Sequence, residues 1–598
     1  MSSLASHGRH LFSQATGHAD ENEAAADDDD DFDLAFSDSD DDSSSGEQKT
    51  GGGGGGAMSF GCVEEAVSET ESQAVKPFIG AIFPPDNHQP SHGHNEAPNA
   101  TLQLEYVFGY CKNTRDAIFS LGNNQVFWPS ASVGILYNQN QAGSASAQSH
   151  LIGHRDEITA AAQSSSNPQF IATGSSQLTR KHEYPTAIVW DTRNNAQINS
   201  YQSVHLKRQV DALAFDDSGQ YLFAAGAGDK HNIVCYNVRD GSETSYVSSG
   251  SSRVLAMEYD SSTRSLVVGG VKSLQFISFG NGTFGTPQRV SADTFVSIKS
   301  SGGTTYCGSA RGKIITYKRG AQSGSVNGHK GGVYSIAVQG RNVATGGKNG
   351  TVTVWKDESY GLSKLRTFNL ALPGAAKGIA FNGPDVVVGS KNGRVVQLNT
   401  STGEETLLGS GHCDGETWGL AMHPFDMQCV TTGDDNMIRC WDLVSMTCTK
   451  SKKLSNVKIK IGNQNKSTRV KSRSSQRRGK RGGAATTGSF GPSNCSRAVD
   501  YDPFGEHIAV GMNDGSFMVL DEATLSKVAH KRGRGRSQWV QGTAFSPLFF
   551  YCVWFIVVER GGGLMIHLAC HTYILLPVVH LLNFFFSLLL LLFCSLLY

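Results

Sequence analysis

The sequence predicts an all-β fold made of repeated four-stranded units, and three observations lead to this prediction. A Gly-containing strand recurs along the chain, the turn after it is rich in Asn, Asp and Gly, and the next strand ends in an aromatic residue or Leu. At 598 residues the chain is too long for one ordinary core. Units of this kind stack on one another, so a large β-propeller is the expected architecture.

The Gly-containing strand sets the period of the repeat. It reads FIATGSS at 170–176, RNVATGGKNG at 341–350 and DVVVGSKNG at 385–393. One glycine from each copy gives Gly174, Gly226, Gly269, Gly308, Gly346, Gly389, Gly433 and Gly511. The intervals between these positions are 52, 43, 39, 38, 43, 44 and 78 residues. A central spacing of roughly 40 residues fits one propeller blade, and the two long intervals are the same period with an insertion.

The turns and the strands that follow them agree with this interpretation. KNG at 348–350 and at 391–393 and NDG at 513–515 supply residues that accept positive φ, as tight hairpins require. The strand after each turn alternates in side-chain character, as in TVTVW ending at Trp355 and MIRCW ending at Trp441. One face of each such strand is expected to pack on the neighbouring blade.

Charge is distributed unevenly outside the repeats. The net charge is −1, yet residues 20–42 carry thirteen Asp or Glu and no Lys or Arg, while 450–481 carry thirteen Lys or Arg and no Asp or Glu. We therefore predict a disordered acidic, Gly-rich tail at 1–75 and a basic flexible insertion at 446–490. Twelve Cys without a CxxC pair, and an N-terminus without an apolar signal segment, favour a reducing cytoplasmic or nuclear setting.

The apolar end of the chain, residues 548–598, has two interpretations. A new repeat begins at 538 and stops at 547, and the last 25 residues are apolar enough to span a bilayer. A membrane anchor is one interpretation. We favour a gene-model artefact, because the break falls inside a blade and would leave an unpaired sheet edge.

Three of the units also carry paired dipeptides at their two ends. Gly153–His154 leads to Trp190–Asp191, Gly328–His329 leads to Trp355, and Gly411–His412 leads to Trp441–Asp442. This pairing resembles the WD-repeat signature. The resemblance implies that His154, Trp190, Asp191, His329, Trp355, His412, Trp441 and Asp442 belong to structural hydrogen-bond networks that link a turn Asp to the blade's Trp.

The segment before the first of these units narrows the resemblance. Residues 98–137 include Pro98, then LQLEYVFGY at 102–110, then Arg115–Asp116 and GILY at 134–137. This segment is similar to the hydrophobic EMAP-like protein (HELP) motif of the echinoderm microtubule-associated protein-like (EMAP-like) family, and the resemblance covers about residues 77–547. It implies a tandem pair of propellers in which HELP contributes strands and a hydrophobic core at their junction.

The expected division of the chain combines the repeats with that resemblance. We expect a HELP motif at 77–137, one complete seven-bladed WD-repeat propeller at 150–445, and the start of a second, truncated propeller at 491–547. The family's association with microtubules implies a cytoskeletal, cytoplasmic scaffold with tubulin and other proteins as partners.

The sequence contains no arrangement that points to catalysis. A nucleophile paired with a base, a phosphate-binding loop and a metal-ligand spacing are all missing, so we expect no catalytic, cofactor-binding or metal-binding residues and no enzyme activity.

The basic insertion is the expected contact for tubulin or another polyanion. The residues expected to make it are Lys471, Arg473, Arg477, Arg478, Lys480 and Arg481. Two alternatives stay open: a WD-repeat adaptor for a signalling or ubiquitin-ligase complex without microtubule contact, and a nucleic-acid-associated protein acting through this insertion. Nucleic acid is the weaker of these, because the insertion lacks aromatic residues for base stacking. Membrane binding depends wholly on 548–598.

Overall fold

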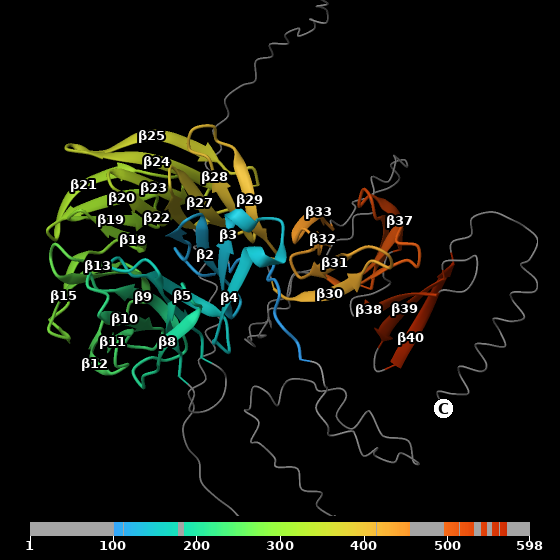
Figure 1. Cartoon of the computed structure of the whole chain (residues 1–598), viewed down its shortest axis with the longest axis horizontal. Helices are drawn as coiled ribbons and strands as arrows, with labels where there is room; N and C mark the ends of the chain where they lie inside the picture. Colours follow the sequence, from blue (N-terminus) through green and yellow to red (C-terminus); the bar gives the residue numbers. More distant parts are fainter. Residues whose placement is uncertain are drawn as a thin grey trace, which may run out of the picture. The chain divides into compact units, whose positions relative to one another are not determined.

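The computed structural model describes most of the chain from residue 101 to residue 570. The described residues are 101–111, 113–177, 184–372, 374–413, 415–454, 495–512 and 515–531, together with the backbone of three strands within 540–570. Within these residues the only helical segments are two 3₁₀ turns, Gln139–Gln141 and Ala145–Ala147. The all-β prediction is confirmed, and the strands form a series of antiparallel sheets (Figure 1).

Seven consecutive sheets occupy residues 119–410. The first contains β1 (Phe119–Gly122), β2 (Gln125–Ser130), β3 (Val133–Asn138) and β4 (Gln148–Ile152). The second contains β5 (Ile158–Gln163), β6 (Phe170–Ser175), β7 (Ala187–Asp191) and β8 (Ala196–Tyr201). The third contains β9 (Val210–Phe215), β10 (Tyr221–Gly226), β11 (Asn232–Asn237) and β12 (Glu243–Ser248).

The fourth sheet has one extra short strand. It contains β13 (Val254–Asp260), β14 (Ser265–Gly270), β15 (Ser273–Gly280), β16 (Thr283–Phe284) and β17 (Gln288–Ser291). The fifth contains β18 (Phe295–Ser301), β19 (Thr304–Ser309), β20 (Lys313–Lys318) and β21 (Ala321–Asn327). The sixth contains β22 (Val333–Gln339), β23 (Asn342–Gly347), β24 (Thr351–Glu358) and β25 (Gly361–Asn369), and the seventh contains β26 (Ala376–Asn382), β27 (Asp385–Ser390), β28 (Arg394–Leu398) and β29 (Glu405–Ser410).

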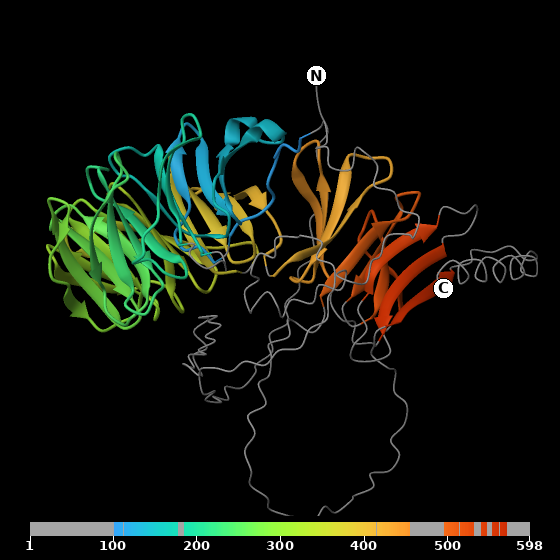
Figure 2. The same cartoon turned by 90° about the horizontal axis from the view of Figure 1, so that it is seen from below.

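The first strands of these sheets form a closed ring. From the second sheet to the seventh, each first strand contacts the first strand of the next sheet, and β26 contacts β1. Figure 2 shows the sheets from a second direction. Ser120 Oγ donates to Asn382 Oδ1 at 2.9 Å, which joins the first sheet to the seventh. Gln163 Nε2 donates to the carbonyl of the same serine at 2.9 Å and joins the second sheet to the first. This is the arrangement of a β-propeller.

The repeated glycines explain how the sheets pack. Each lies in the second strand of its sheet: in β6, β10, β14, β19, β23, β27, β31 and β35. A Cβ added at Gly174 would lie 2.6 Å from Val210 Cγ1, and one added at Gly269 would lie 2.7 Å from Ile298 Cδ1, both on the first strand of the next sheet. At Gly389 the neighbours are instead Tyr110 Cζ at 2.5 Å and Ile118 Cδ1 at 2.6 Å, from the segment that leads into β1. The same close approach therefore recurs where the ring closes.

The ring begins one sheet earlier than the sequence analysis placed it. The predicted limits were 150–445, whereas the sheets with contacting first strands run from Phe119 to Ser410. Strand β2 has the sequence QVFWPS, in which Pro129 and Ser130 stand at the fifth and sixth positions, where the other second strands carry glycine. The glycine period could not reveal this sheet. The predicted propeller therefore left it out and included the later sheet that ends near residue 445.

That later sheet packs with the strands that follow it. It contains β30 (Thr417–Met422), β31 (Gln428–Gly433), β32 (Met437–Asp442) and β33 (Thr447–Lys453), and the next sheet contains β34 (Ser496–Tyr501), β35 (His507–Met512), β36 (Phe517–Asp521) and β37 (Lys527–Lys531). The two sheets share a buried core that includes Val430, Ile438, Val499 and Ile508.

The basic insertion begins later than predicted. Residues 447–453, which we had placed in the insertion, form strand β33, and Leu454 is buried in the core shared with the next sheet. Lys450 Nζ forms an ion pair with Glu522, and Lys452 Nζ donates to the carbonyl of Leu525 at 2.6 Å. These two lysines hold sheet β30–β33 to sheet β34–β37, because both acceptors lie beyond strand β36.

The repeat also continues past residue 547, where the sequence analysis ended it. A three-stranded sheet contains β38 (Val540–Ser546), β39 (Val553–Arg560) and β40 (Gly563–Cys570). Residues 553–570 thus pair as strands within the range predicted to be an artefact or an anchor. Among the described residues, no helix is long and apolar enough to cross a membrane.

The close approach at Gly389 leads to a testable prediction. Gly389→Ala places a methyl group against Tyr110 and Ile118, and overpacking of this kind costs about 1–3 kcal/mol. The free energy of unfolding in urea should fall by that amount. Gly280→Ala is the control, because a Cβ there meets nothing within 4 Å. Equal stability of the two variants would contradict the packing described for the ring closure.

Candidate functional site

The three predicted His–Trp pairs each meet on one Thr hydroxyl. In the second sheet, His154 Nε2 lies 2.7 Å from Thr173 Oγ1, and Trp190 Nε1 donates to the same oxygen at 2.8 Å. The corresponding distances are 2.8 and 2.9 Å for His329, Trp355 and Thr345, and 2.8 and 2.7 Å for His412, Trp441 and Thr431. Because the indole N–H can only donate, each Thr oxygen accepts from Trp, and its own hydrogen is free to be donated to His Nε2.

The second ring nitrogen of each His has a different environment. His412 Nδ1 lies 2.8 Å from Asp435 Oδ1, which is the predicted link to a turn Asp. His329 Nδ1 instead lies 2.7 Å from Thr351 Oγ1. His154 Nδ1 is buried and has no hydrogen-bond partner among the described residues. The Asp link thus occurs in one of the three units.

Asp435 is the centre of a small charged cluster in the turn between β31 and β32. Arg439 Nη1 lies 2.7 Å from Asp435 Oδ2, and the carboxylate and the guanidinium are both nearly inaccessible to solvent. Burial alone would raise the pKa of Asp435, but the hydrogen bond and charge of His412, together with Arg439, outweigh it and lower the pKa to about 2. The carboxylate therefore stays ionised and fixes both the imidazole and the guanidinium.

The Asp residues of the Trp–Asp dipeptides lie outside these networks, so this part of the prediction is wrong. Asp191 pairs with the neighbouring Arg193, whose Nη2 lies 2.6 Å from Asp191 Oδ2. Asp442 accepts from the backbone N–H groups of Val444 and Ser445 at 2.8 and 3.0 Å. Both carboxylates stabilise the turn after the third strand, because a side chain at a strand end reaches the following turn rather than the blade interior.

The bridging threonines were not among the residues predicted for these networks. Thr173, Thr345 and Thr431 each stand in the second strand, one or two residues before the repeated glycine, as in ATG and TTG. Among the described second strands, a Thr at this position occurs in just the three units that carry the Gly–His and Trp pair. That coincidence was available from the sequence as a signal.

A strap formed by residues 106–111 joins the first sheet to sheet β30–β33. Val107 and Gln148 exchange two hydrogen bonds, with N–H to Oε1 at 2.9 Å and Nε2–H to carbonyl at 3.1 Å. Trp128 Nε1 donates to the carbonyl of Gly109 at 3.0 Å. On its other side, the Phe108 ring lies 4.4 Å from the Trp441 ring, centroid to centroid. The strap thus places an aromatic side chain directly on one of the predicted network residues.

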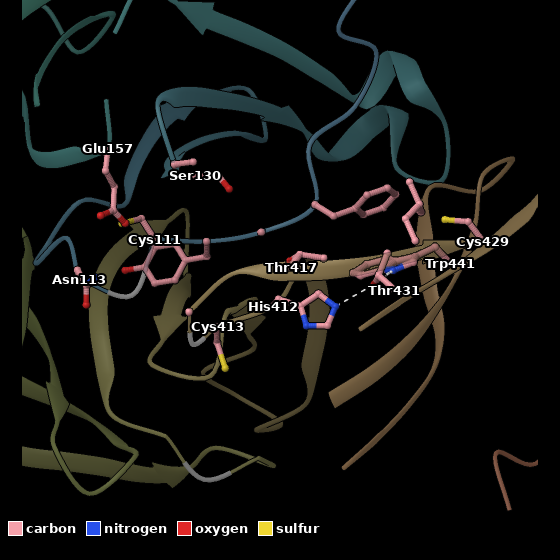
Figure 3. Close-up of a pocket in the computed structure, with 16 residues that line it drawn as sticks. Cys111, Asn113, Ser130, Glu157, His412, Cys413, Thr417, Cys429, Thr431 and Trp441 are labelled. Carbon is pink, nitrogen blue, oxygen red and sulfur yellow. Dashed lines mark hydrogen bonds between the residues drawn. The ribbon is translucent and has the colours of Figure 1, made fainter. Parts of the chain in front are cut away.

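A cavity of about 530 Å³ lies between the strap and sheet β30–β33. Its lining includes Phe108, Cys111, Glu157, His412 and Trp441 (Figure 3). In Figure 3 His412 points toward Thr431, and Cys111 lies beside Glu157. The walls are therefore partly aromatic and partly polar.

The polar groups of this cavity are engaged with one another. Both ring nitrogens of His412 are within hydrogen-bond distance of other side chains, and Cys111 Sγ donates to Glu157 Oε1 at 3.2 Å. Burial, followed by the Glu157 charge, raises the pKa of the Cys111 thiol to about 11, which keeps it protonated and weakly nucleophilic at neutral pH. Among the described residues, no group of three or more His, Cys, Asp or Glu is placed to hold a metal ion.

The basic residues predicted to contact tubulin lie outside the described part of the chain. Lys471, Arg473, Arg477, Arg478, Lys480 and Arg481 all fall within 455–494. Their role stays a prediction.

Comparison with known proteins gives matches to repeats and to longer relatives. A family model described as "WD domain, G-beta repeat" matches residues 320–356 and 405–442, the units of Trp355 and Trp441. A ciliary WD repeat-containing protein of Euplotoides octocarinatus is 26% identical over 81% of this chain. Human echinoderm microtubule-associated protein-like 2 is 24% identical over 84% of it. The chain spans 66% of the length of the ciliary protein and 76% of that of the human protein.

Solved structures are also similar to part of the chain. The structure of U3-55K covers 46% of it at 14% identity with a TM-score of 0.39, and the WD40 repeats of RRP9 give the same coverage, identity and score.

The sheets and the His–Thr–Trp units, with the family model that matches two of them, define a WD-repeat β-propeller protein. The relatives that are similar to more than four fifths of the chain are a ciliary WD repeat-containing protein and an EMAP-like protein.

The bridging hydroxyl can be tested by Thr431→Val, which keeps the shape of the side chain and removes the shared oxygen. The indole N–H of Trp441 and the imidazole of His412 would lose a partner, and unsatisfied buried groups cost about 1–3 kcal/mol each. Chemical denaturation should show a loss in that range. Thr447→Val, at an exposed position in the same sheet, should change stability by less than about 0.5 kcal/mol. A similar loss in both variants would argue against the network.

The buried histidines predict a pH dependence of stability. Burial lowers the pKa of His154 and of His329 from 6.5 to about 4. The unfolded chain therefore binds protons that the folded chain does not between pH 6.5 and 4, so stability is full above 6.5 and is lost as pH falls toward 4. Thermal unfolding at a series of pH values should show this decline. It should be shallower in His154→Gln/His329→Gln, and an unchanged slope would contradict the assignment.

Proposed function

We propose that this chain is a non-catalytic microtubule-associated scaffold that binds tubulin and other cytoskeletal proteins through the exposed faces of its propeller. One observation carries the proposal: relatives named as ciliary and microtubule-associated match 81% and 84% of the chain. Matches of this length extend over the repeats and into the strands beyond residue 417. The corresponding location is the cytoskeleton, in the cytoplasm.

The absence of catalysis is part of this proposal, and the state of the polar groups supports it. The His, Thr and Trp side chains of each unit are bonded to one another, and such buried networks fix packing. Burial raises the pKa of Cys111 to about 11 and that of Cys440 to about 12. These thiols are not activated as nucleophiles.

We also propose a division of the chain that follows the packing. Residues 119–410 would form one seven-bladed propeller, and residues 417–570 would form the beginning of a second. The HELP segment, 77–137, would supply the strap and the first three strands of the ring. The position of Phe108 on Trp441 and of Ile118 beside Gly389 supports this division.

The basic insertion would strengthen the contact with tubulin by electrostatic attraction. Its positive charge would act on acidic protein surfaces over about 8–10 Å at physiological salt. The six residues from Lys471 to Arg481 named above would supply most of this attraction.

The proposal is tested by co-sedimentation of the full chain with polymerised tubulin at low and moderate salt. The full chain should pellet at both, and a variant with all six basic residues changed to Gln should lose about tenfold in affinity at low salt and less at moderate salt. The matched control changes Asn463, Gln464, Asn465, Ser467, Ser474 and Ser475 to Ala, which alters as many positions in the same segment without altering its charge.

Each outcome of that experiment has a clear meaning. Loss of pelleting in the Gln variant alone assigns the contact to the insertion. A folded full chain that stays in the supernatant at both salt concentrations overturns the microtubule proposal and favours an adaptor without microtubule contact.

A further inference from the structure

Basic residues recur at one position in five successive sheets of the ring. Each stands in the turn between the second and third strands, two to four residues after the repeated glycine. They are Lys230, Lys272, Arg311, Lys348 and Lys391, and all five are exposed. We call them the turn cations.

The turn cations lie on one face of the ring. In each of these sheets the turn is hydrogen-bonded to the connection that enters the same sheet: Ala227 N–H donates to the carbonyl of Gln209 at 3.0 Å, and Lys391 N–H donates to that of Ala375 at 2.8 Å. Strands within a sheet alternate in direction, so these turns and these connections share one end of every sheet. The connections themselves add Lys207, Arg208 and Lys330, which are exposed as well.

This face is more basic than the opposite one. Its described turns and connections between residues 119 and 410 hold ten Lys or Arg and four Asp or Glu. The turns at the other end of the same sheets hold five Lys or Arg and four Asp or Glu. The excess positive charge is therefore a property of one end of the ring and does not follow from the composition of the chain, whose net charge is −1.

Most of this charge is not used to hold the fold together. Among the described residues, no carboxylate lies within ion-pair distance of Lys230, Lys272, Lys330 or Lys348. Arg311 lies 3.9 Å from Asp293, and its side chain is 86% exposed, so the contact is loose. Exposed pairs of this kind contribute little to stability.

The corresponding turn in sheet β30–β33 shows what a structural turn charge looks like. It carries Asp434 and Asp435 in place of a cation. Asp434 accepts from Trp418 Nε1 at 3.0 Å, and Asp435 holds His412 and Arg439. The carboxylates of this turn are bonded to neighbouring side chains and so stabilise the fold. Lys230, Lys272, Lys330 and Lys348 have no carboxylate partner among the described residues.

We infer that the face bearing the turn cations is a docking surface for an acidic segment of a partner protein. Single ammonium groups spaced one to a sheet match carboxylates distributed along an extended peptide. A nucleic acid fits less well, because in the third to seventh sheets, which bear the turn cations, the described turns and connections on this face contain no Phe, Tyr or Trp on which a base could stack. The inference deepens the proposed function, and it rests on that function because it assumes that the partner is a protein.

The test compares charge reversals at the two ends of the same three sheets. Lys230→Glu/Lys272→Glu/Arg311→Glu alters the turn cations of the third, fourth and fifth sheets. Arg239→Glu/Arg264→Glu/Arg319→Glu is the control, with exposed turn arginines at the opposite ends of those sheets and the same change in net charge. Both are made in the full chain whose six insertion residues from Lys471 to Arg481 are Gln. The probe is a fluorescent synthetic peptide of alternating Glu and Gly, followed by anisotropy at low salt.

The expected result is a loss of at least about tenfold in affinity for the first triple variant, a change of less than about twofold for the control, and weakening of all binding by salt. An equal loss in both variants, or no saturable binding by the parent chain, overturns the inference. Tighter binding of a single-stranded oligonucleotide than of the peptide, with the same sensitivity to the first triple variant, overturns the choice of an acidic protein.

Microtubule co-sedimentation of the same variants separates this inference from the proposed function. If peptide binding depends on the turn cations but no variant pellets, the proposed function fails and the docking surface stands. If the parent chain pellets and the first triple variant binds peptide as the control does, the docking surface fails and the proposed function stands.

Discussion

The fold depends on one constraint, the close approach of the second strand of each sheet to the first strand of the next. A Cβ added at Gly174, Gly269, Gly308 or Gly346 would lie within 3 Å of the first strand of the next sheet, and one added at Gly389 would meet Tyr110 and Ile118, just before β1. At these five positions the absence of a Cβ allows neighbouring sheets of the ring to pack closely.

The strap extends this constraint beyond the ring. Tyr110 and Ile118 fill the space beside Gly389, while Phe108, two residues before Tyr110, packs on Trp441. A short segment therefore closes the ring on one side and contacts the following sheet on the other. The His412–Thr431–Trp441 network holds that Trp in a fixed orientation, so the polar network in sheet β30–β33 and the packing of the strap support each other.

Charge plays two different roles on the same scaffold. In the β31–β32 turn the carboxylate of Asp435 is buried and bonded, and its pKa of about 2 shows that the ionised form is stabilised by His412 and Arg439. In three of the corresponding turns of the ring, Lys230, Lys272 and Lys348 are exposed, and no carboxylate of the described residues lies within ion-pair distance of them. The same turn can carry either a structural carboxylate or an exposed cation. Its backbone requires only residues that allow a tight reversal of the chain, and it does not restrict the charge of the other side chains.

The sequence by itself determined the all-β class, the period of the blades and the His–Trp pairs, because each depends on local strand and turn chemistry that repeats along the chain. The tertiary structure decided where the ring begins. The first sheet has Pro129 and Ser130 where the others have glycine, and its place is revealed by contacts between residues far apart in sequence, such as Asn382 and Ser120. It also decided that Lys450 and Lys452 belong to a strand, that Thr431 bridges His and Trp, and that the turn cations share one face, because these facts depend on which distant segments are brought together.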